Sequence, residues 1–390
     1  MKKADNNLNG KVKKALMRIG VGMLTLLLGG VFSFYLAIGC GLLPEVQSVW
    51  IGSAMTTFHN HWLAEAFIPQ SVIDSVINAN KVDDSNVEST VQIEKPEEKP
   101  HVKTPEEKEA EEEQKYRAEG YEKLSSGVYL KEVTGATNSG KFVGYLMLCT
   151  DPSRVKLVDT DRQFSCGATV AMMIEKSGAV AGINGGGFND GPNYDSNGGT
   201  PSGIIIEDGE LVCPRNYDSN FRIIGINSEG TMILKNGSAA WAMENGLRCA
   251  VSAEQFLIVD GERMITKGDG GWGIAPRTAL GQRKSGEIIL LAIDGRQLGY
   301  SIGADLVSIQ EILYEEGCIN AAMMDGGSST VMEKATYSED GSCTVELINK
   351  PNLGTELSDQ RYINNAWVIM PKVSAAETEE AENVSEGTTE

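Results

Sequence analysis

Residues 303–332 read GADLVSIQEILYEEGCINAAMMDGGSSTVM, which combines helix, strand and turn signals in direct succession. Residues 303–316 have the apolar spacing of a helix, and residues 319–324 form an apolar run of strand length. The glycines that follow permit positive φ and close approach of the backbone to a ligand. The stretch therefore predicts a buried strand that ends in a polar turn. That turn consists of Asp325, Gly326, Gly327, Ser328, Ser329 and Thr330.

An isolated Asp-Gly pair is more typical of an ordinary hairpin turn. A second unit of the same kind argues for more than a hairpin, because a helix expected near 166–177 precedes an apolar strand and glycine loop at 179–187. Between about 120 and 372, short β-like runs alternate with Asp-Gly and Ser-Gly turn signals. We therefore expect a β-rich α+β fold with a mixed sheet and few helices, and no doubly wound nucleotide-binding sheet.

The N-terminal region predicts a membrane anchor. Residues 1–18 carry six Lys or Arg and one Asp, and residues 19–43 carry no charge and can span a bilayer. We expect a single-pass protein of the cell membrane, with residues 1–18 in the cytoplasm and a single catalytic domain outside. A signal peptide and a lipoprotein cleavage site before Cys40 are the alternatives.

Between the anchor and the main domain, two segments of different character are expected. Residues 44–80 have the apolar spacing of an amphipathic helical stem, which either lies on the membrane surface or packs on the main domain. Residues 81–119 hold 13 acids against 7 bases and predict an acidic, disordered linker. The last segment, 373–390, has six Glu and no base and predicts a disordered tail.

Composition excludes several function classes. The net charge of −20 argues against a nucleic-acid partner. The last histidine is His101, so a domain that starts near 120 contains neither a Ser-His-Asp triad nor a His-ligated zinc site. The seven cysteines form no CxxC pair, and those beyond Cys40 either form disulfides or remain buried thiols.

Other candidate site residues follow strands in the same way. The loop at 184–187 joins an Asn to three glycines but lacks the register of a dinucleotide site, so its amides face an anion or a sugar instead. Three arginines stand at strand edges, where they either form structural ion pairs with nearby aspartates or recognise phosphate oxygens. The set comprises Asn184, Gly185, Gly186, Gly187, Arg277, Thr278, Asp294, Arg296, Arg361 and Asn364.

Taken together, these segments resemble the phosphodiester glycosidase family over roughly residues 125–370. The order is Ile183-Asn184-Gly185-Gly186, Arg277-Thr278-Ala279, Asp294-Gly295-Arg296, Asp325 to Thr330, and Arg361 followed by Asn364-Asn365. Gly187 departs from the family pattern, which commonly has an aromatic residue there. The resemblance implies hydrolysis of the bond between a sugar anomeric carbon and a phosphodiester oxygen. No histidine is required, because a phosphomonoester is a good leaving group.

On this hypothesis Asp325 or Asp294 is the nucleophile or general base, and Arg277, Arg296 and Arg361 bind the phosphate. The remaining candidates orient sugar hydroxyls or phosphate oxygens. The expected substrate is a sugar-phosphate glycan or polymer of the cell envelope, and no cofactor is expected. Two alternatives stay open: a non-catalytic polysaccharide-binding protein, and a phosphodiesterase whose divalent cation is held by the two aspartates.

Overall fold

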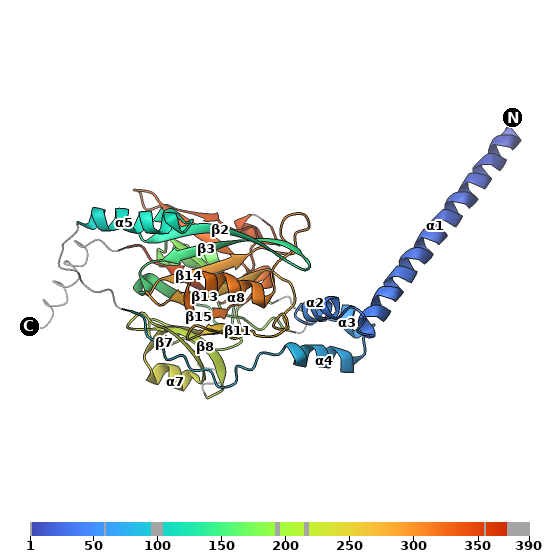
Figure 1. Ribbon diagram of the computed structural model, residues 1–390. Helices are drawn as coiled ribbons and strands as arrows, with labels where there is room; N and C mark the ends of the chain where they lie inside the picture. The colour runs from blue at the N-terminus through green and yellow to red at the C-terminus, as the bar shows by residue number, and fades with distance from the viewer. Residues whose placement is uncertain are drawn as a thin grey trace, which may run out of the picture. The chain divides into compact units, whose positions relative to one another are not determined.

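The computed structural model describes residues 2–57, 60–94, 104–191, 196–213, 218–354 and 356–372. The chain divides into two compact units. The first comprises residues 1–81 with 271–273, and the second comprises residues 82–270 with 274–390. Figure 1 follows the chain through both units.

The first unit is helical. Its helices are α1 (Lys2–Gly39), α2 (Pro44–Met55), α3 (Trp62–Glu65) and α4 (Gln70–Asn80). Within α1, Val12–Gly39 is long and apolar enough to cross a membrane, and a signal sequence would satisfy the same criteria. The end of α1 and the three short helices share a small apolar core, in which Ile38, Ile51 and Ile73 are fully buried. The expected helical stem is therefore a packed helical cluster.

The second unit contains three sheets, and every strand pair described in it is antiparallel, so the sheets are not mixed as the sequence predicted. In sheet order, the largest consists of β1 (Glu122–Ser125), β2 (Val128–Thr137), β3 (Gly140–Cys149), β14 (Ile288–Ile293), β13 (Arg277–Arg283), β15 (Cys318–Met323), β11 (Gln255–Val259) and β12 (Glu262–Arg263). The second consists of β7 (Glu210–Leu211), β6 (Ile205–Glu207), β10 (Leu247–Ser252), β8 (Phe221–Asn227) and β9 (Met232–Gly237). The third consists of β17 (Cys343–Leu347), β16 (Met332–Tyr337), β5 (Ala181–Asn184), β18 (Asn365–Ile369) and β4 (Val155–Asp159).

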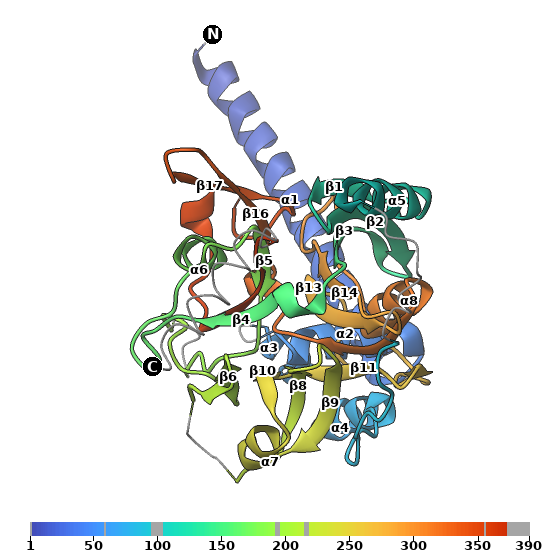
Figure 2. The same ribbon diagram turned by 90° about the vertical axis from the view of Figure 1, so that its left-hand side faces the viewer.

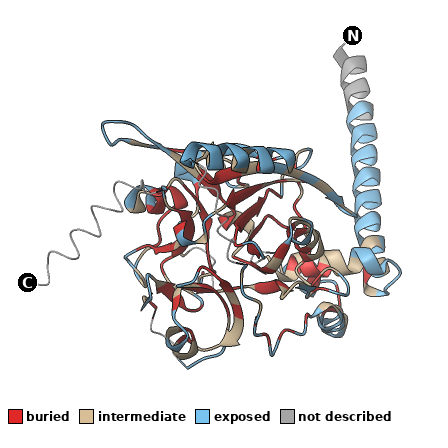
Figure 3. Cartoon of the chain, turned by 60° about the vertical axis from the view of Figure 1, so that its left-hand side comes forward, coloured by how far each residue is buried: buried red, intermediate tan, exposed pale blue. Residues whose placement is uncertain are grey.

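The three sheets enclose one apolar core, and Figure 2 shows their strands grouped around it. Each sheet contributes fully buried side chains, such as Leu290, Ile224 and Trp367. Figure 3 shows the same distribution, with buried residues concentrated in the strands. All seven cysteines lie in the described residues and none forms a disulfide, and Cys149 and Cys249 belong to this core.

Both helices expected in the main domain are present, and each begins at a side-chain cap. Thr169 accepts a hydrogen bond from Met172 N (3.2 Å) at the start of α6 (Val170–Ser177), which ends at Gly178 with φ 73°. Asp305 accepts from Ser308 N (2.8 Å) at the start of α8 (Leu306–Glu315). Such caps satisfy amide groups that the first helical turn leaves unpaired. The β-rich α+β class is thus confirmed, with one further short helix, α7 (Ala239–Glu244), that the sequence did not predict.

The region expected to be a disordered linker differs from that expectation where it is described. Residues 82–94, here called the strap, lie in extended form along the second unit. Ser89 N donates to Leu234 O (2.8 Å), and Thr90 N donates to the carboxylate of Asp260 (2.9 Å). After residues 95–103, which lie outside the described residues, α5 (Pro105–Ala118) begins at a Thr104–Glu107 capping box.

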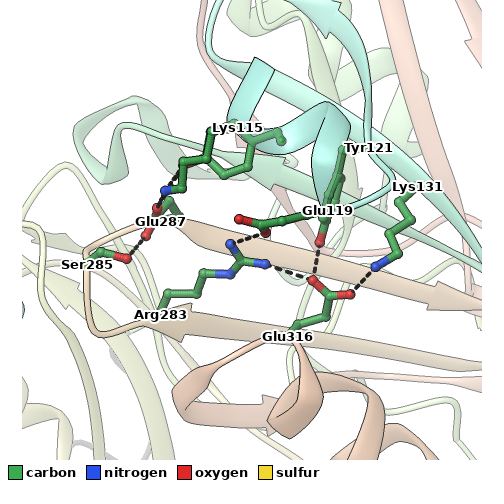
Figure 4. A network of polar contacts seen from close by, with 9 residues as sticks. Lys115, Glu119, Tyr121, Lys131, Arg283, Ser285, Glu287 and Glu316 are labelled. Atoms are coloured by element: carbon green, nitrogen blue, oxygen red, sulfur yellow. Dashed lines mark hydrogen bonds and ion pairs between the residues drawn. The ribbon is translucent and has the colours of Figure 1, made fainter. Parts of the chain in front are cut away.

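A network of charges joins the end of α5 to the largest sheet, as Figure 4 shows. The Arg283 guanidinium donates to Glu119 (2.7 Å) and to Glu316 (2.8 Å). Glu316 also accepts from Lys131 (2.6 Å) and from the Tyr121 hydroxyl (2.8 Å). Because the charges are paired and hydrogen-bonded, their partial burial is tolerated and α5 is fixed to the sheet.

Candidate functional site

The two glycine turns predicted from the sequence meet in the structure, although they follow strands of different sheets. Asn184 at the end of β5 donates from Nδ2 to Asp325 O (2.7 Å), and Asp325 N donates to Gly185 O (3.1 Å). Asn184 Oδ1 accepts from the Thr278 hydroxyl (2.7 Å) and from Val331 N (3.2 Å). Asn184 and Thr278 therefore hold the turns together, with their own polar groups already engaged.

The amides of the first glycine loop are also largely engaged by the protein. Gly185 N donates to Asn365 O (3.1 Å), and Gly186 N donates to Asn365 Oδ1 (2.9 Å). Asn364 Nδ2 donates to Gly187 O (3.3 Å). The expected cradle of amides for an anion is thus not formed by Gly185 and Gly186, whose role is to fix the loop beside Asp325.

Asp325 lies at the centre of the candidate site and is partly accessible to solvent. Burial raises the pKa of its carboxyl to about 6, and the nearby carboxylate of Asp190 acts in the same direction. The Ser329 hydroxyl, the positive charge of Arg361 and the amide of Gly326 oppose this rise. A carboxyl with a pKa near neutrality in a polar turn is suited to acid–base or nucleophilic work.

A second carboxyl beside Asp325 escaped the sequence analysis. Glu254 lies between β10 and β11, and its amide donates to Met323 O (2.9 Å) at the end of β15. Burial, with a smaller contribution from the Asp325 carboxylate, raises the pKa of Glu254 to about 7, while the positive charge of Arg222 opposes the rise. The two carboxyls therefore interact electrostatically, and such pairs titrate together. Carboxyls whose pKa values are raised towards neutrality by burial are characteristic of functional sites.

Gly187 provides the space that Glu254 occupies. A Cβ at residue 187 would clash with Glu254 Oε1 and would lie 3.0 Å from Ser202 Oγ. An aromatic side chain at this position would meet the same atoms. The glycine at position 187, where the resembled family commonly has an aromatic residue, therefore leaves room for the Glu254 side chain in this chain.

Two arginines approach the second turn. Arg277 is 3% exposed, and its Nε donates to Ala304 O (3.1 Å). Burial, with a smaller contribution from the positive charge of Arg296, lowers the pKa of Arg277 to about 10. Arg296 is exposed, has a φ of 59°, and places Nη1 3.5 Å from Ser328 Oγ. Two neighbouring guanidinium groups, one of them lowering the pKa of the other, create an attractive place for an anion.

Arg361 flanks Asp325 from another side. Its guanidinium forms an ion pair with the buried Asp190 and lies 4.7 Å from the centre of the Phe188 ring. The structure thus brings Arg361 near the catalytic candidate Asp325, but within an ion pair of its own. The interpretation of Arg361 as a phosphate ligand stays a prediction.

Asp294 is buried, with 1% of its surface exposed, and its carboxylate is saturated with donors. It accepts from Tyr300 OH (2.9 Å), Asn349 Nδ2 (2.9 Å) and Lys350 N (3.0 Å). Burial raises its pKa, while these hydrogen bonds act against the rise. This arrangement holds the 349–350 segment in place, which suits a positioning role better than that of a nucleophile.

The hydroxyls of the second turn point to a further polar contact. Gly327–Ser329 form a 3-10 turn, and the Thr330 hydroxyl that follows is buried without a hydrogen-bond partner among the described residues. An unsatisfied buried hydroxyl is costly unless a ligand or water completes it. Within the described part of the chain, no group of three His, Cys, Asp or Glu side chains is arranged to hold a metal ion.

Comparison with known proteins identifies this region of the chain. Residues 177–370 match the family model described as phosphodiester glycosidase. Over 191 residues the chain is 28% identical to the SPbeta prophage-derived uncharacterized protein YomE of Bacillus subtilis (strain 168). The match covers 46% of this chain and 27% of that protein, so the chain spans about a quarter of the length of this relative.

The fold is similar to solved structures. The catalytic domain of zebrafish N-acetylglucosamine-1-phosphodiester alpha-N-acetylglucosaminidase, auto-inhibited by its pro-peptide, aligns with a TM-score of 0.50 and 20% identity. That alignment covers 64% of this chain and 86% of the zebrafish chain. A hypothetical protein from Synechocystis aligns with a TM-score of 0.48 and 15% identity, over 64% of this chain and 63% of that one.

Proposed function

We propose that the protein hydrolyses the glycosidic bond of a sugar-1-phosphodiester in a cell-envelope glycan, a proposal supported by the match of residues 177–370 to the phosphodiester glycosidase family model. The observation that carries the proposal is the Glu254–Asp325 carboxyl pair, with pKa values of about 7 and about 6, beside the cationic pair Arg277–Arg296. The reaction requires stabilisation of positive charge at the anomeric carbon and of negative charge on the phosphate leaving group. The carboxyl pair is suited to the first requirement and the cationic pair to the second.

The proposed chemistry breaks the bond between the anomeric carbon and the phosphate oxygen. Asp325, ionised above a pH of about 6, stabilises positive charge at the anomeric carbon or attacks it directly. Glu254, still largely protonated below a pH of about 7, donates its proton to the departing phosphate oxygen. Water supplies the hydroxyl of the released sugar and returns a proton to Glu254. The products are a free sugar and a phosphomonoester.

The phosphate is assigned to the space in front of Arg296 and Arg277. Arg296 is exposed and can contact phosphate oxygens directly, while the buried Arg277 contributes its charge from behind. The Ser328 and Thr330 hydroxyls lie on the same turn, and the unsatisfied Thr330 hydroxyl is available to a ligand oxygen or a bridging water. Dispersed phosphate charge is best stabilised by such preorganised donors.

The remaining sequence candidates are assigned to the support of the site. Asn184, Thr278, Gly185 and Gly186 hold the two turns together through hydrogen bonds within the protein. Asp294 is assigned to the support of the 349–350 segment in the same way. None of these residues is assigned a contact with the substrate.

The N-terminal helix supports a location at a membrane. Val12–Gly39 is long and apolar enough to cross a membrane, and basic residues lie before it and in its first turns. With the basic end in the cytoplasm, the glycosidase domain would lie outside the cell, next to envelope polymers. A tethered enzyme of this kind acts on a substrate that does not diffuse away.

The reaction can be tested with the full chain in detergent and the methyl phosphodiester of N-acetylglucosamine 1-phosphate, in water enriched in oxygen-18. Label in the released sugar supports carbon–oxygen cleavage and the proposed activity. Label in phosphate identifies phosphorus–oxygen cleavage and a phosphodiesterase. Binding of envelope polymer without turnover of several sugar diesters identifies a non-catalytic binding protein.

A further inference from the structure

The strap lies outside the region matched by the family model, yet it reaches the segment that carries Glu254. Asp84 of the strap is 6% exposed, and its two carboxylate oxygens accept hydrogen bonds from Nε and Nη2 of Arg222 on β8. Gln255 Nε2 also donates to this carboxylate (2.8 Å), and Asn236 Nδ2 donates to Asp84 O. Asp84 is thus held from three strands of the second unit.

Arg222 extends this contact to both sides of Glu254. Arg222 Nη1 donates to Glu254 O (3.3 Å), and Arg222 O accepts from Ala253 N (2.7 Å). Because Gln255 donates a hydrogen bond to Asp84, the three consecutive residues 253–255 are all hydrogen-bonded to Asp84 or to Arg222. The carboxyl of Glu254 itself faces the site, beside Gly187 and Ser202.

We propose that Asp84 is a positioning residue for the hydrolysis: through Arg222 it fixes the backbone and the electrostatic surroundings of Glu254. The strap is then part of the catalytic unit, although it precedes the glycosidase domain in sequence by almost a hundred residues. This inference rests on the proposed function, because it assigns a role through Glu254. It differs from a purely structural role, since it predicts changes in the ionisation of one catalytic group.

The charged groups around Glu254 determine the sign of those changes. Asp325 faces it from the turn after β15, and Arg222 from β8, with Asp84 behind Arg222 on the strap. Asp190 and Arg361 act on Asp325, its partner. Removal of the Arg222 charge raises the pKa of Glu254. Removal of the Asp84 charge leaves Arg222 unneutralised and lowers it.

The test is the pH dependence of kcat for the full-length protein and three variants, with the methyl phosphodiester of N-acetylglucosamine 1-phosphate as the probe. The limb of the profile on which kcat falls with rising pH reports the pKa of Glu254 in the enzyme–substrate complex. We expect Arg222→Gln to move this limb to higher pH and Asp84→Asn to move it to lower pH, each by about half a pH unit. Glu88→Gln is the matched control, because Glu88 lies on the same strap and pairs with Lys235 at the surface.

Opposite shifts, with an unmoved profile for Glu88→Gln, support the proposal. Equal losses of kcat with unmoved limbs in both variants overturn it and leave only a structural role. If Asp84→Asn does not fold, as judged by circular dichroism, Arg222→Gln and Arg222→Lys decide instead: only the former should move the limb. Wild-type protein without turnover overturns the proposed function and this inference with it, whereas wild-type turnover with unmoved limbs overturns this inference alone.

Discussion

The side-chain amide of Asn184 donates to the backbone carbonyl of Asp325 at 2.7 Å and thereby connects two turns that belong to different sheets. The same side chain accepts hydrogen bonds from Thr278 and Val331, so three of its hydrogen-bonding positions are occupied within the protein. Asn184 is 1% exposed. These hydrogen bonds support the proposed role of Asn184 in positioning Asp325.

Asn184→Ala should therefore destabilise the protein and impair catalysis together. The substitution leaves the Thr278 hydroxyl, the Val331 amide and the Asp325 carbonyl without their partner, at an expected cost of about 2–4 kcal/mol in the free energy of unfolding. Urea unfolding measures this cost, with the exposed Asn86→Ala as the control. Unchanged stability together with a raised KM would instead assign Asn184 to the substrate.

The turns were predictable from the sequence because their signals are local. An apolar run followed by Asp-Gly-Gly or Asn-Gly-Gly marks a strand end where the backbone must bend sharply, and both predicted turns are present at Asn184 and Asp325. What the sequence did not reveal is how their polar groups are used. The sequence suggested that Asn184 binds the substrate, whereas in the structure its hydrogen-bond partners come from β13 and from the turn beyond β15.

Glu254 was missed because nothing local distinguishes it. It stands in an ordinary connection between two strands, and its proximity to Asp325 arises only because β11 pairs with β15. The strap was missed for a different reason: its composition is polar, and it is held through backbone amides and through buried Asp84. Composition predicts solvation, whereas specific hydrogen bonds between distant residues are invisible to it.

The activity should follow a bell-shaped pH profile with its maximum between about 6 and about 7. Asp325 must be ionised, so kcat rises as the pH increases through its pKa of about 6. Glu254 must be protonated, so kcat falls as the pH increases through its pKa of about 7. Asp325→Asn and Glu254→Gln should each reduce kcat by about 10²–10⁴-fold. Full activity in either variant would contradict the assignment.

Glu254→Gln should also stabilise the fold at alkaline pH. The pKa of Glu254 is higher in the folded state than in the unfolded chain, so ionisation of this group costs stability as the pH rises. The variant removes that cost and should gain about 1–2 kcal/mol at pH 8, with no gain below about pH 4. Thermal unfolding at both pH values measures the difference. Glu339→Gln, at an exposed position, should show no such dependence.

Arg296→Ala should weaken substrate binding more than it weakens the fold. The side chain is exposed and contacts Ser328 only loosely, at 3.5 Å, so little native structure depends on it. Loss of a charge-assisted contact to phosphate should raise KM or lower kcat/KM by about 10–100-fold. Arg263→Ala removes an exposed arginine that pairs with Glu311 and is the control. Unaltered kinetics in Arg296→Ala would show that Arg296 does not bind the phosphate.

Asp294→Asn separates a positioning role from the catalytic role that the sequence suggested. The carboxylate accepts hydrogen bonds from Asn349 and Lys350 at Oδ1 and from Tyr300 at Oδ2; asparagine keeps one acceptor oxygen, and the amide nitrogen that replaces Oδ2 cannot accept from Tyr300. We expect a loss of about 2–3 kcal/mol in stability, because a buried donor loses its acceptor. The limbs of the pH profile should stay in place, with kcat reduced less than about 10-fold. Asp340→Asn, in an exposed turn, is the matched control. A loss of activity of about 10³-fold at unchanged stability would instead assign a catalytic role to Asp294.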